Sequence, residues 1–149
     1  MTKEQSLQMF REMGKADAID LRGRAKDMDG TGIIAEEEKI PAFDPQHDYS
    51  AWPVGSPVAD EEQVWVLIQP YNAAWYAGRP SGLRALWGLC HTNDPKKAKP
   101  WVEPYGTSGM YMMDECYRDE DGKVWKCLTN NVVYDAKTMP SWWEEVEVT

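Results

Sequence analysis

The chain has 149 residues and a formal net charge of -9, with 16 Lys and Arg against 25 Asp and Glu. This acidic balance disfavours nucleic acid and anionic membranes as partners, because both attract basic surfaces. A neutral polysaccharide is compatible with it, since sugar rings stack on aromatic side chains without the help of charge. No apolar stretch follows the first residues, so we expect no signal peptide, no membrane insertion and synthesis in a cytoplasm.

The aromatic residues divide the chain into two parts. There are 8 Trp, 7 Tyr and 2 Phe, and all of them except Phe10 lie at or after Phe43. Small modules need such large side chains to build a core. We predict a mainly β protein with an α-helical N-terminal arm and two small antiparallel β-modules in tandem. The predicted parts are the arm over residues 1–40, a first module over 41–92, a linker over 93–99 and a second module over 100–149.

The arm has the periodicity of a helix. Apolar residues recur every three or four positions over residues 3–28, with Thr2 as the N-cap and Gln5 completing a capping box. Gly14 is a candidate break, and residues 33–40 predict a short second helix. This apolar stripe is too narrow to stabilise an isolated helix. The helix must therefore pack on the body, on sister copies or on another protein. We assign oligomerisation to four residues of this stripe: Leu7, Phe10, Leu21 and Met28.

From Phe43 onward, short apolar runs alternate with turn residues, which is typical of strands. The Asp-Gly pair within residues 119–122 predicts a hairpin turn. We expect strands over residues 57–58, 64–68, 86–89, 111–116, 124–129 and 143–148.

The body contains one pattern twice, with a period of about 60 residues. The apolar strands at 64–68 and 124–128 each centre on a Trp. A proline-framed segment with an aromatic residue precedes each strand, and a segment ending in Trp follows it. We interpret the pattern as two copies of one β-module, and small modules rich in Trp more often bind than catalyse.

The second copy resembles a known family. The residues that carry the resemblance occur in family order: Trp101, Tyr111, Gly122, Lys123, Trp125, Cys127, Pro140, Trp142 and Trp143. This order resembles the small carbohydrate-binding modules attached to bacterial chitinases and cellulases. The first copy looks like a degenerate version. Such modules preceded by a short helical arm also resemble small proteins encoded among tailed-phage structural genes, and residues 34–43 match the join between arm and module. Asp114-Glu115 departs from the usual Gly-Asp of the family.

Comparison of the two copies separates candidate core residues from candidate site residues. The aromatic positions common to both copies predict a core made of Trp65, Trp87, Trp125 and Trp143. Trp142 aligns with Leu86, and neighbours in a strand face opposite sides. If Trp143 points inward, Trp142 therefore points outward. It could stack a sugar ring there, or pack on the arm or on a neighbouring subunit.

Three further aromatic residues complete the predicted carbohydrate-binding set. Trp75 and Tyr76 lie in an insertion of the first copy, and Tyr134 lies in the second. The alternative for the insertion is a loop that folds over the open end of its module.

Neither catalysis nor a bound cofactor is indicated. No motif typical of hydrolases, metalloproteases or phosphate-binding loops occurs, so we expect no enzyme, no cofactor and no metal. Cys90, Cys116 and Cys127 are odd in number and lack a C-x-x-C spacing. They predict reduced, buried thiols, with a Cys116–Cys127 bridge as the alternative.

The resemblance implies a non-enzymatic virion protein of a tailed phage, as a capsid decoration, head fibre or tail component. Its expected partners are other virion proteins through the arm and a host-surface glycan through the modules. A homo-oligomer is expected, with a trimer favoured by analogy with fibre-like virion proteins. The alternatives are a glycan-binding accessory of a secreted polysaccharide hydrolase, and an assembly protein whose modules no longer bind sugar.

Overall fold

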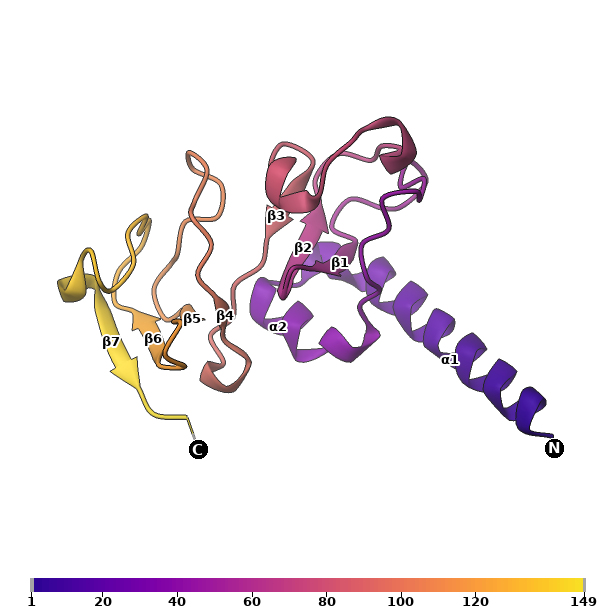
Figure 1. The fold of residues 1–149 in the computed structure, drawn as a ribbon, viewed down its shortest axis with the longest axis horizontal. Coiled ribbons are helices and arrows are strands. Elements are labelled where there is room, and N and C mark those ends of the chain that lie inside the picture. Colours follow the sequence, from indigo (N-terminus) through magenta and orange to yellow (C-terminus); the bar gives the residue numbers. More distant parts are fainter. Residues whose placement is uncertain (1, 149) are drawn as a thin grey trace.

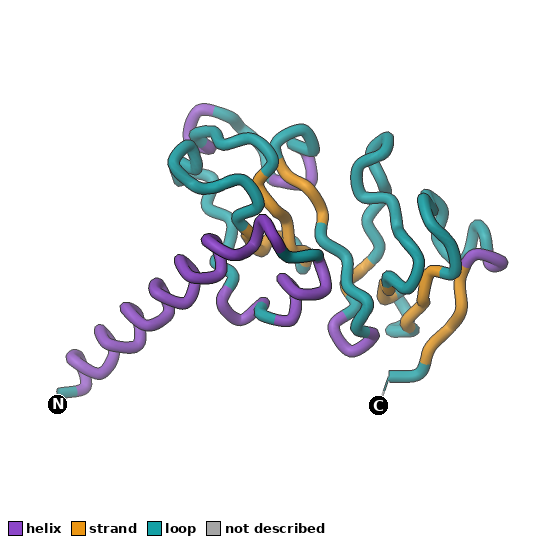
Figure 2. Tube along the Cα trace, turned by 180° about the vertical axis from the view of Figure 1, so that it is seen from behind, coloured by secondary structure: helices purple, strands orange, loops and turns teal. Residues whose placement is uncertain are grey.

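A computed structural model describes residues 2–148 of the chain. One helix, α1 (Lys3–Arg24), projects from a body of two small sheets joined by long loops, as Figures 1 and 2 show. The architecture is mostly β with a helical N-terminal arm, which confirms the predicted fold class at that level.

The two sheets follow one another along the chain. The first has three antiparallel strands, β1 (Pro57–Asp60), β2 (Gln63–Leu67) and β3 (Trp87–Leu89). The second has four strands in chain order, β4 (Lys99–Pro100), β5 (Cys116–Arg118), β6 (Val124–Cys127) and β7 (Trp143–Val146). Because β4 pairs with β5 in parallel, the second sheet is not purely antiparallel as predicted.

The helical arm begins with the predicted capping box. The Thr2 hydroxyl accepts a hydrogen bond from the Gln5 amide at 3.1 Å, and the Gln5 side chain accepts one from the Thr2 amide at 2.8 Å. The helix runs through Gly14 without a break. The second helix, α2 (Gly30–Ala35), begins three residues before its predicted start because Asp29 caps it, and a short 3-10 helix (Glu37–Lys39) follows.

The apolar stripe of the arm is exposed near the N-terminus and buried near its other end. Leu7 and Phe10 are 49% and 70% exposed, whereas Leu21 is 0% exposed. Met28 packs at the edge of a cluster that joins the arm to the first sheet, formed by Ala25, Ile33, Ile34, Val64 and Cys90. This corrects the assignment of Leu21 and Met28 to oligomerisation, because their own body already covers that part of the stripe.

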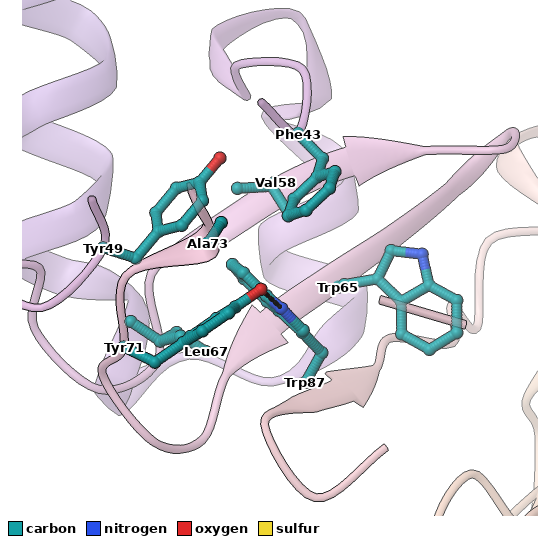
Figure 3. Packing of buried hydrophobic residues seen from close by; sticks show 8 residues of the cluster. All are labelled: Phe43, Tyr49, Val58, Trp65, Leu67, Tyr71, Ala73 and Trp87. Atoms are coloured by element: carbon teal, nitrogen blue, oxygen red, sulfur yellow. Dashed lines mark hydrogen bonds between the residues drawn. The ribbon is translucent and has the colours of Figure 1, made fainter. Parts of the chain in front are cut away.

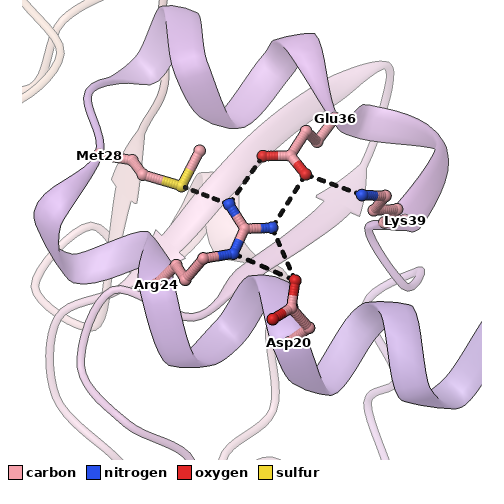
Figure 4. A network of polar contacts seen from close by, with 5 residues as sticks. All are labelled: Asp20, Arg24, Met28, Glu36 and Lys39. Carbon is pink, nitrogen blue, oxygen red and sulfur yellow. Dashed lines mark hydrogen bonds and ion pairs between the residues drawn. The ribbon is translucent and has the colours of Figure 1, made fainter.

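An ion-pair network fastens α1 to the turn after α2 (Figure 4). The Arg24 guanidinium donates to both carboxylate oxygens of Glu36, at 3.1 and 2.9 Å, and also to Asp20. Lys39 adds a second cation on Glu36 at 2.9 Å. Hydrogen bonds from Arg24 and Lys39 lower the pKa of Glu36 to about 2.

The pairing registers of the two sheets match. Leu67 lies opposite Trp87 in the first sheet, and Cys127 lies opposite Trp143 in the second. Trp65 and Trp125 face the preceding strand at Val58 and Tyr117. Backbone hydrogen bonds to the last residues of β2 and β6 also match. The Gly55 amide donates to the Leu67 carbonyl, and the Asp114 amide donates to the Cys127 carbonyl, both at 2.8 Å.

Each sheet has an aromatic core of similar design (Figure 3 shows the first). Phe43 stacks on Tyr49 at 5.9 Å in one core, and Trp101 stacks on Tyr111 at 4.9 Å in the other. Trp87 and Trp143 meet these stacks edge-on. Of the four Trp predicted as core, Trp65, Trp87 and Trp143 are buried and Trp125 is half-buried.

The predicted strand over residues 111–116 is wrong. Tyr111 makes only an isolated bridge with Val132, and β5 begins at Cys116. The cause is Asp114, whose φ of 74° turns the backbone out of the extended conformation.

The predicted linker is an ordered part of the body. It contains a 3-10 helix (Pro95–Lys97) and the first residue of β4. The Asn93 amide donates to the Thr31 hydroxyl at 2.8 Å, and Lys99 forms an ion pair with Glu37. These contacts fasten the segment to α2 and to the 3-10 helix that follows it.

All three cysteines are buried and free. The alternative of a Cys116–Cys127 bridge is therefore wrong. Burial raises the pKa of the Cys90 thiol to about 12 and that of Cys116 to about 11, so both remain protonated at neutral pH.

Candidate functional site

An aromatic pair on the surface of the second half is the strongest candidate site. The rings of Tyr134 and Trp142 stack with centroids 6.3 Å apart and planes inclined by 23°. Tyr134 is 48% exposed, while Trp142 is half-buried against the second core. The pair therefore has one ring exposed to solvent and one ring anchored in the fold.

Trp143 positions this pair from inside the core. Its indole Nε1 donates to the Tyr134 carbonyl at 2.8 Å, which fixes the loop that carries the Tyr134 ring. Trp142 precedes it at the end of a 3-10 helix (Pro140–Trp142), where its carbonyl accepts from the Leu128 amide at 2.9 Å. Trp142 thus ends the 3-10 helix and Trp143 begins β7, so the strand alternation used to orient Trp142 does not apply.

The loop that carries Tyr134 is held at several further points. The backbones of Tyr111 and Val132 exchange two hydrogen bonds of 2.9 Å. The Ala136 amide donates to the Tyr117 hydroxyl at 2.9 Å, and Asp135 accepts from the Thr138 amide at 3.0 Å. A loop fixed in this way loses little conformational entropy when a ligand binds.

A polar groove of about 470 Å³ lies in the same half, and Asp135, which follows Tyr134 in the chain, is one of its lining residues. Its lining combines aromatic, acidic and basic side chains: Pro100, Trp101, Tyr117, Arg118, Asp119, Glu120, Asp135 and Lys137. Lys137 forms an ion pair with Glu120 across its rim. Carboxylates of this kind accept hydrogen bonds from hydroxyl groups, and an aromatic wall suits the C–H face of a sugar.

Asp119 stays ionised in this groove. Its carboxylate accepts from the Trp125 indole at 2.9 Å and from the amides of Asp121 and Lys123, also at 2.9 Å. The Trp125 bond is the largest of the effects that lower the pKa of Asp119. Trp125, predicted as core, thus orders one wall of the groove.

The four aromatic residues predicted to bind carbohydrate do not form one site. Trp75 and Tyr76 belong to the loop after β2, and Tyr134 and Trp142 lie by β7 at the other side of the body (Figure 1). Trp75 is 83% exposed at the end of a 3-10 helix (Ala73–Trp75), and Tyr76 meets Tyr71 edge-on at 5.9 Å. They form a separate surface that is more exposed than the Tyr134–Trp142 pair.

None of the residues that line the groove was predicted as a site residue from the sequence, including Trp101, Tyr117 and Asp135. The sequence does mark Trp101, because it is the aromatic residue of the second proline-framed segment and corresponds to Phe43 in the first. Phe43 is buried. The half-burial of Trp101, in place of full burial, indicates that one edge is available. No sequence signal placed Tyr117 or Asp135 beside it.

The described residues contain neither a metal-binding group nor a membrane-spanning helix. Within residues 2–148, no group of three or more His, Cys, Asp or Glu could hold a metal ion. No helix in this part of the chain has the length and apolar content needed to cross a membrane.

No protein-family model matches the chain, and no curated protein matches it with significance.

Proposed function

We propose that the chain is a non-enzymatic binding protein of a tailed-phage virion, in which two carbohydrate-binding-type modules stand on a helical arm. The glycan site lies in the second module. The observation that carries the proposal is the Tyr134–Trp142 pair, which the buried Trp143 holds in place.

Matching contacts support two copies of one module. The counterparts Trp87 and Trp143 lie at the same register position, and each meets a stacked aromatic pair edge-on. The parallel bridge between Ala42 and Ala59 corresponds to the pairing of Pro100 with Arg118. Such agreement at many separate contacts is the pattern that duplication of one module would leave.

The aromatic pair has the chemistry of a sugar platform. A sugar presents one face of C–H groups, which packs on an aromatic ring, and a rim of hydroxyls, which need acceptors and donors. The rings of Tyr134 and Trp142 supply the first, and the groove lined in part by Asp135 supplies the second. In the first module Leu86 stands at the position of Trp142, so that copy lacks the platform.

The arm supplies the attachment that the proposal requires. The exposed Leu7 and Phe10 lie beyond the part of α1 that the body covers, so they are free to pack on other chains. We propose that this end of the helix binds sister copies, in a trimer, or other virion proteins. The phage setting itself rests on the resemblance of residues 33–149.

Retention on insoluble chitin and cellulose tests the glycan site. Tyr134→Ala and Trp142→Ala should each weaken retention by about 1–3 kcal/mol, if a sugar ring stacks as strongly as a nucleic-acid base. Leu86→Ala is the matched control, because Leu86 is the counterpart of Trp142 in the first module. If all three variants are retained as well as the unmodified protein, the alternative of an assembly protein without sugar binding is favoured.

The virion setting has its own test. Mass spectrometry of purified phage particles, from a lysate in which the gene is expressed, should find the chain in constant ratio to the capsid or tail proteins. Its recovery only in the soluble fraction would reject a virion component and leave the accessory module of a hydrolase as the better proposal.

A further inference from the structure

A groove runs along α1 where the helix leaves the body beside the chain that follows α2 (Figure 1). Its volume is about 750 Å³, larger than that of the groove near Tyr134. One wall is α1 between Arg11 and Arg22, and the other is formed by residues 38–41. Since a helix rises about 1.5 Å per residue, the wall is roughly 16 Å long, the length of about five residues of extended chain.

The middle of this groove is apolar and open. Ala18, Ile40 and Pro41 are half-buried in it, and Ile19 is 60% exposed. A Cβ atom added at Gly14 would meet no atom within 4 Å. Glycine inside a helix costs about 1 kcal/mol relative to alanine, so Gly14 weakens α1 and leaves free space in the groove.

Positive charge surrounds the apolar middle. Four basic and two acidic residues line the groove, an excess of two positive charges in a chain whose net charge is -9. Lys39 is paired with Glu36. The other three cations, Arg11, Lys15 and Arg22, form no ion pair within the described part of the chain. The groove therefore has cations to offer to an anionic partner.

The Trp52 ring holds one of these cations in place. The Arg22 guanidinium carbon lies 4.1 Å from the centroid of this ring. Trp52 in turn meets Tyr49 edge-on at 4.7 Å and packs against the first core. A cation held on an aromatic ring loses little conformational freedom when a carboxylate binds to it. Arg22 is therefore positioned before any partner arrives.

Acidic runs of the chain itself already have partners. The runs at residues 36–38, 60–62, 119–121 and 144–145 each form at least one ion pair with a Lys or Arg of the same chain. A sister copy would have to break such a pair before it could place a carboxylate in the groove. The charges therefore favour a different protein as the occupant.

We propose that this groove binds an acidic segment of a different protein. An apolar side chain of that segment packs over Gly14 and Ala18, and its carboxylates bind the three unpaired cations. The surface does not depend on the glycan site or on the exposed Leu7 and Phe10, because neither Leu7, Phe10 nor any residue of the aromatic pair lines it.

A titration of the whole protein with a capped peptide of alternating Glu and Leu, about six residues long, tests the groove. The NMR signals of the Gly14 amide and the Ile19 methyl groups should shift, and the indole signal of Trp142 should not. The same peptide with Gln in place of Glu should bind about tenfold more weakly, because the exposed ion pairs are lost. Salt at about 1 M should weaken binding of the Glu peptide alone.

Two matched pairs of variants locate the binding. Gly14 and Gly23 both lie in α1 with open space around an added Cβ, and only Gly14 lines the groove. Both Gly14→Leu and Gly23→Leu should strengthen the helix, but only Gly14→Leu should reduce binding, by about tenfold or more. Lys15→Glu should reduce binding at least fivefold, whereas Lys3→Glu, the same change outside the groove, should leave it unchanged.

Equal binding of the Glu and Gln peptides would overturn the proposal, as would shifts that spare both Gly14 and Ile19. Absence of binding of the Glu peptide at millimolar concentration and low salt would overturn it too. Light scattering covers the remaining occupant. If Gly14→Leu converts an oligomer of the unmodified chain into a monomer, a sister copy covers the groove, and its assignment to a different protein is wrong.

Discussion

Trp143 links the second core to the surface aromatic pair. Its ring meets Tyr111 and Tyr117 edge-on inside the module, at 5.4 and 4.8 Å. Its Nε1 reaches the Tyr134 carbonyl at 2.8 Å. One side chain therefore stabilises the fold and also fixes the loop that presents Tyr134.

Trp143→Phe should separate these two effects. Phe keeps an aromatic ring in the core but loses the bond to Tyr134, so we expect a loss of about 1–3 kcal/mol in the free energy of unfolding. Urea denaturation measures this loss. Retention on chitin should fall too, because the loop is no longer held.

Trp87→Phe is the matched control for that variant. Trp87 donates its Nε1 to the Tyr71 hydroxyl at 2.8 Å in the first core. Its replacement should lower stability to a similar degree and leave glycan retention unchanged. If Trp143→Phe retains full binding, the bond to Tyr134 does not shape the site.

The buried thiols predict how the protein responds to alkaline pH. The pKa of Cys90 is raised to about 12 and that of Cys116 to about 11 by burial. In the unfolded chain a thiol titrates near 8.5, so above that pH the folded state binds more protons than the unfolded state. The stability contributed by the protonated thiols is complete below about pH 8 and decreases as the pH rises from there toward 11.

Melting temperatures measured between pH 7 and 11 test this expectation and should fall above about pH 9. Thiol reagents at pH 8 should label none of the three cysteines in the folded protein and all of them in denaturant. A reductant should leave the melting temperature unchanged. A marked decrease on reduction would contradict the absence of a disulfide.

At the scale of elements, α1 has an exposed N-terminal part and a C-terminal part that packs on the body. Leu7 and Phe10 lie on the same helical face as Leu21 and Ala25, which are buried in the body. The body ends before the first turns of the helix, so the apolar face continues into solvent. Self-association is therefore assigned to the N-terminal turns alone.

Two truncations test that division. Removal of residues 1–17 leaves Leu21 and Ala25 in place, so the product should be folded, monomeric and within a few degrees of the original melting temperature. Removal of residues 1–30 also deletes these two buried residues and should destabilise the first half strongly. Light scattering and thermal unfolding measure both outcomes. If the full-length chain is itself monomeric, self-association through α1 is wrong, and attachment to another protein replaces it.

The sequence predicts the central strand of each sheet, but it predicts only some of the strands that pair with them. Residues 64–68 and 124–129 are apolar runs bounded by turn residues. β2 is shifted by one residue from the first range, and β6 begins at the predicted residue and ends two residues early. β4 was missed because two residues give no periodicity, and it forms only through pairing with β5. The misplaced strand over residues 111–116 contains Asp114 at a position where the first half has Gly55, also at positive φ. A glycine there would have marked the turn, but an aspartate does not.

At the scale of the whole molecule, the two halves are locked together. The Gln63 side chain donates to the Pro100 carbonyl at 2.8 Å, and the Cys116 amide donates to Thr92 O at 2.8 Å. Arg84 reaches the carbonyls of Glu103 and Ser108, each at 3.3 Å. Composition alone predicted a linker here, because Pro and Lys are frequent in loops and these long-range partners cannot be read from the sequence.

The sequence identified Tyr134 and Trp142 as site residues but did not predict how they are arranged. Comparison of the two copies singled out Trp142, because Leu86 replaces it in the first. It could not show that Tyr134 lies on Trp142, since seven residues separate them and hydrogen bonds to Tyr111, Tyr117 and Trp143 set the path of the chain between them. The groove was missed for the same reason.

The most direct test of the account is an NMR titration of the indole N–H signals with a soluble chitin oligosaccharide. The chain has 8 Trp, each of which gives one such signal. We predict a saturable shift of the Trp142 signal and a smaller shift of Trp101, with Trp65 and Trp87 unchanged because they are buried in the first half. Tyr134→Ala should abolish the shift of Trp142. Shifts confined to Trp75, or no shift of any indole at millimolar oligosaccharide, would contradict the proposal that the second module presents a glycan platform.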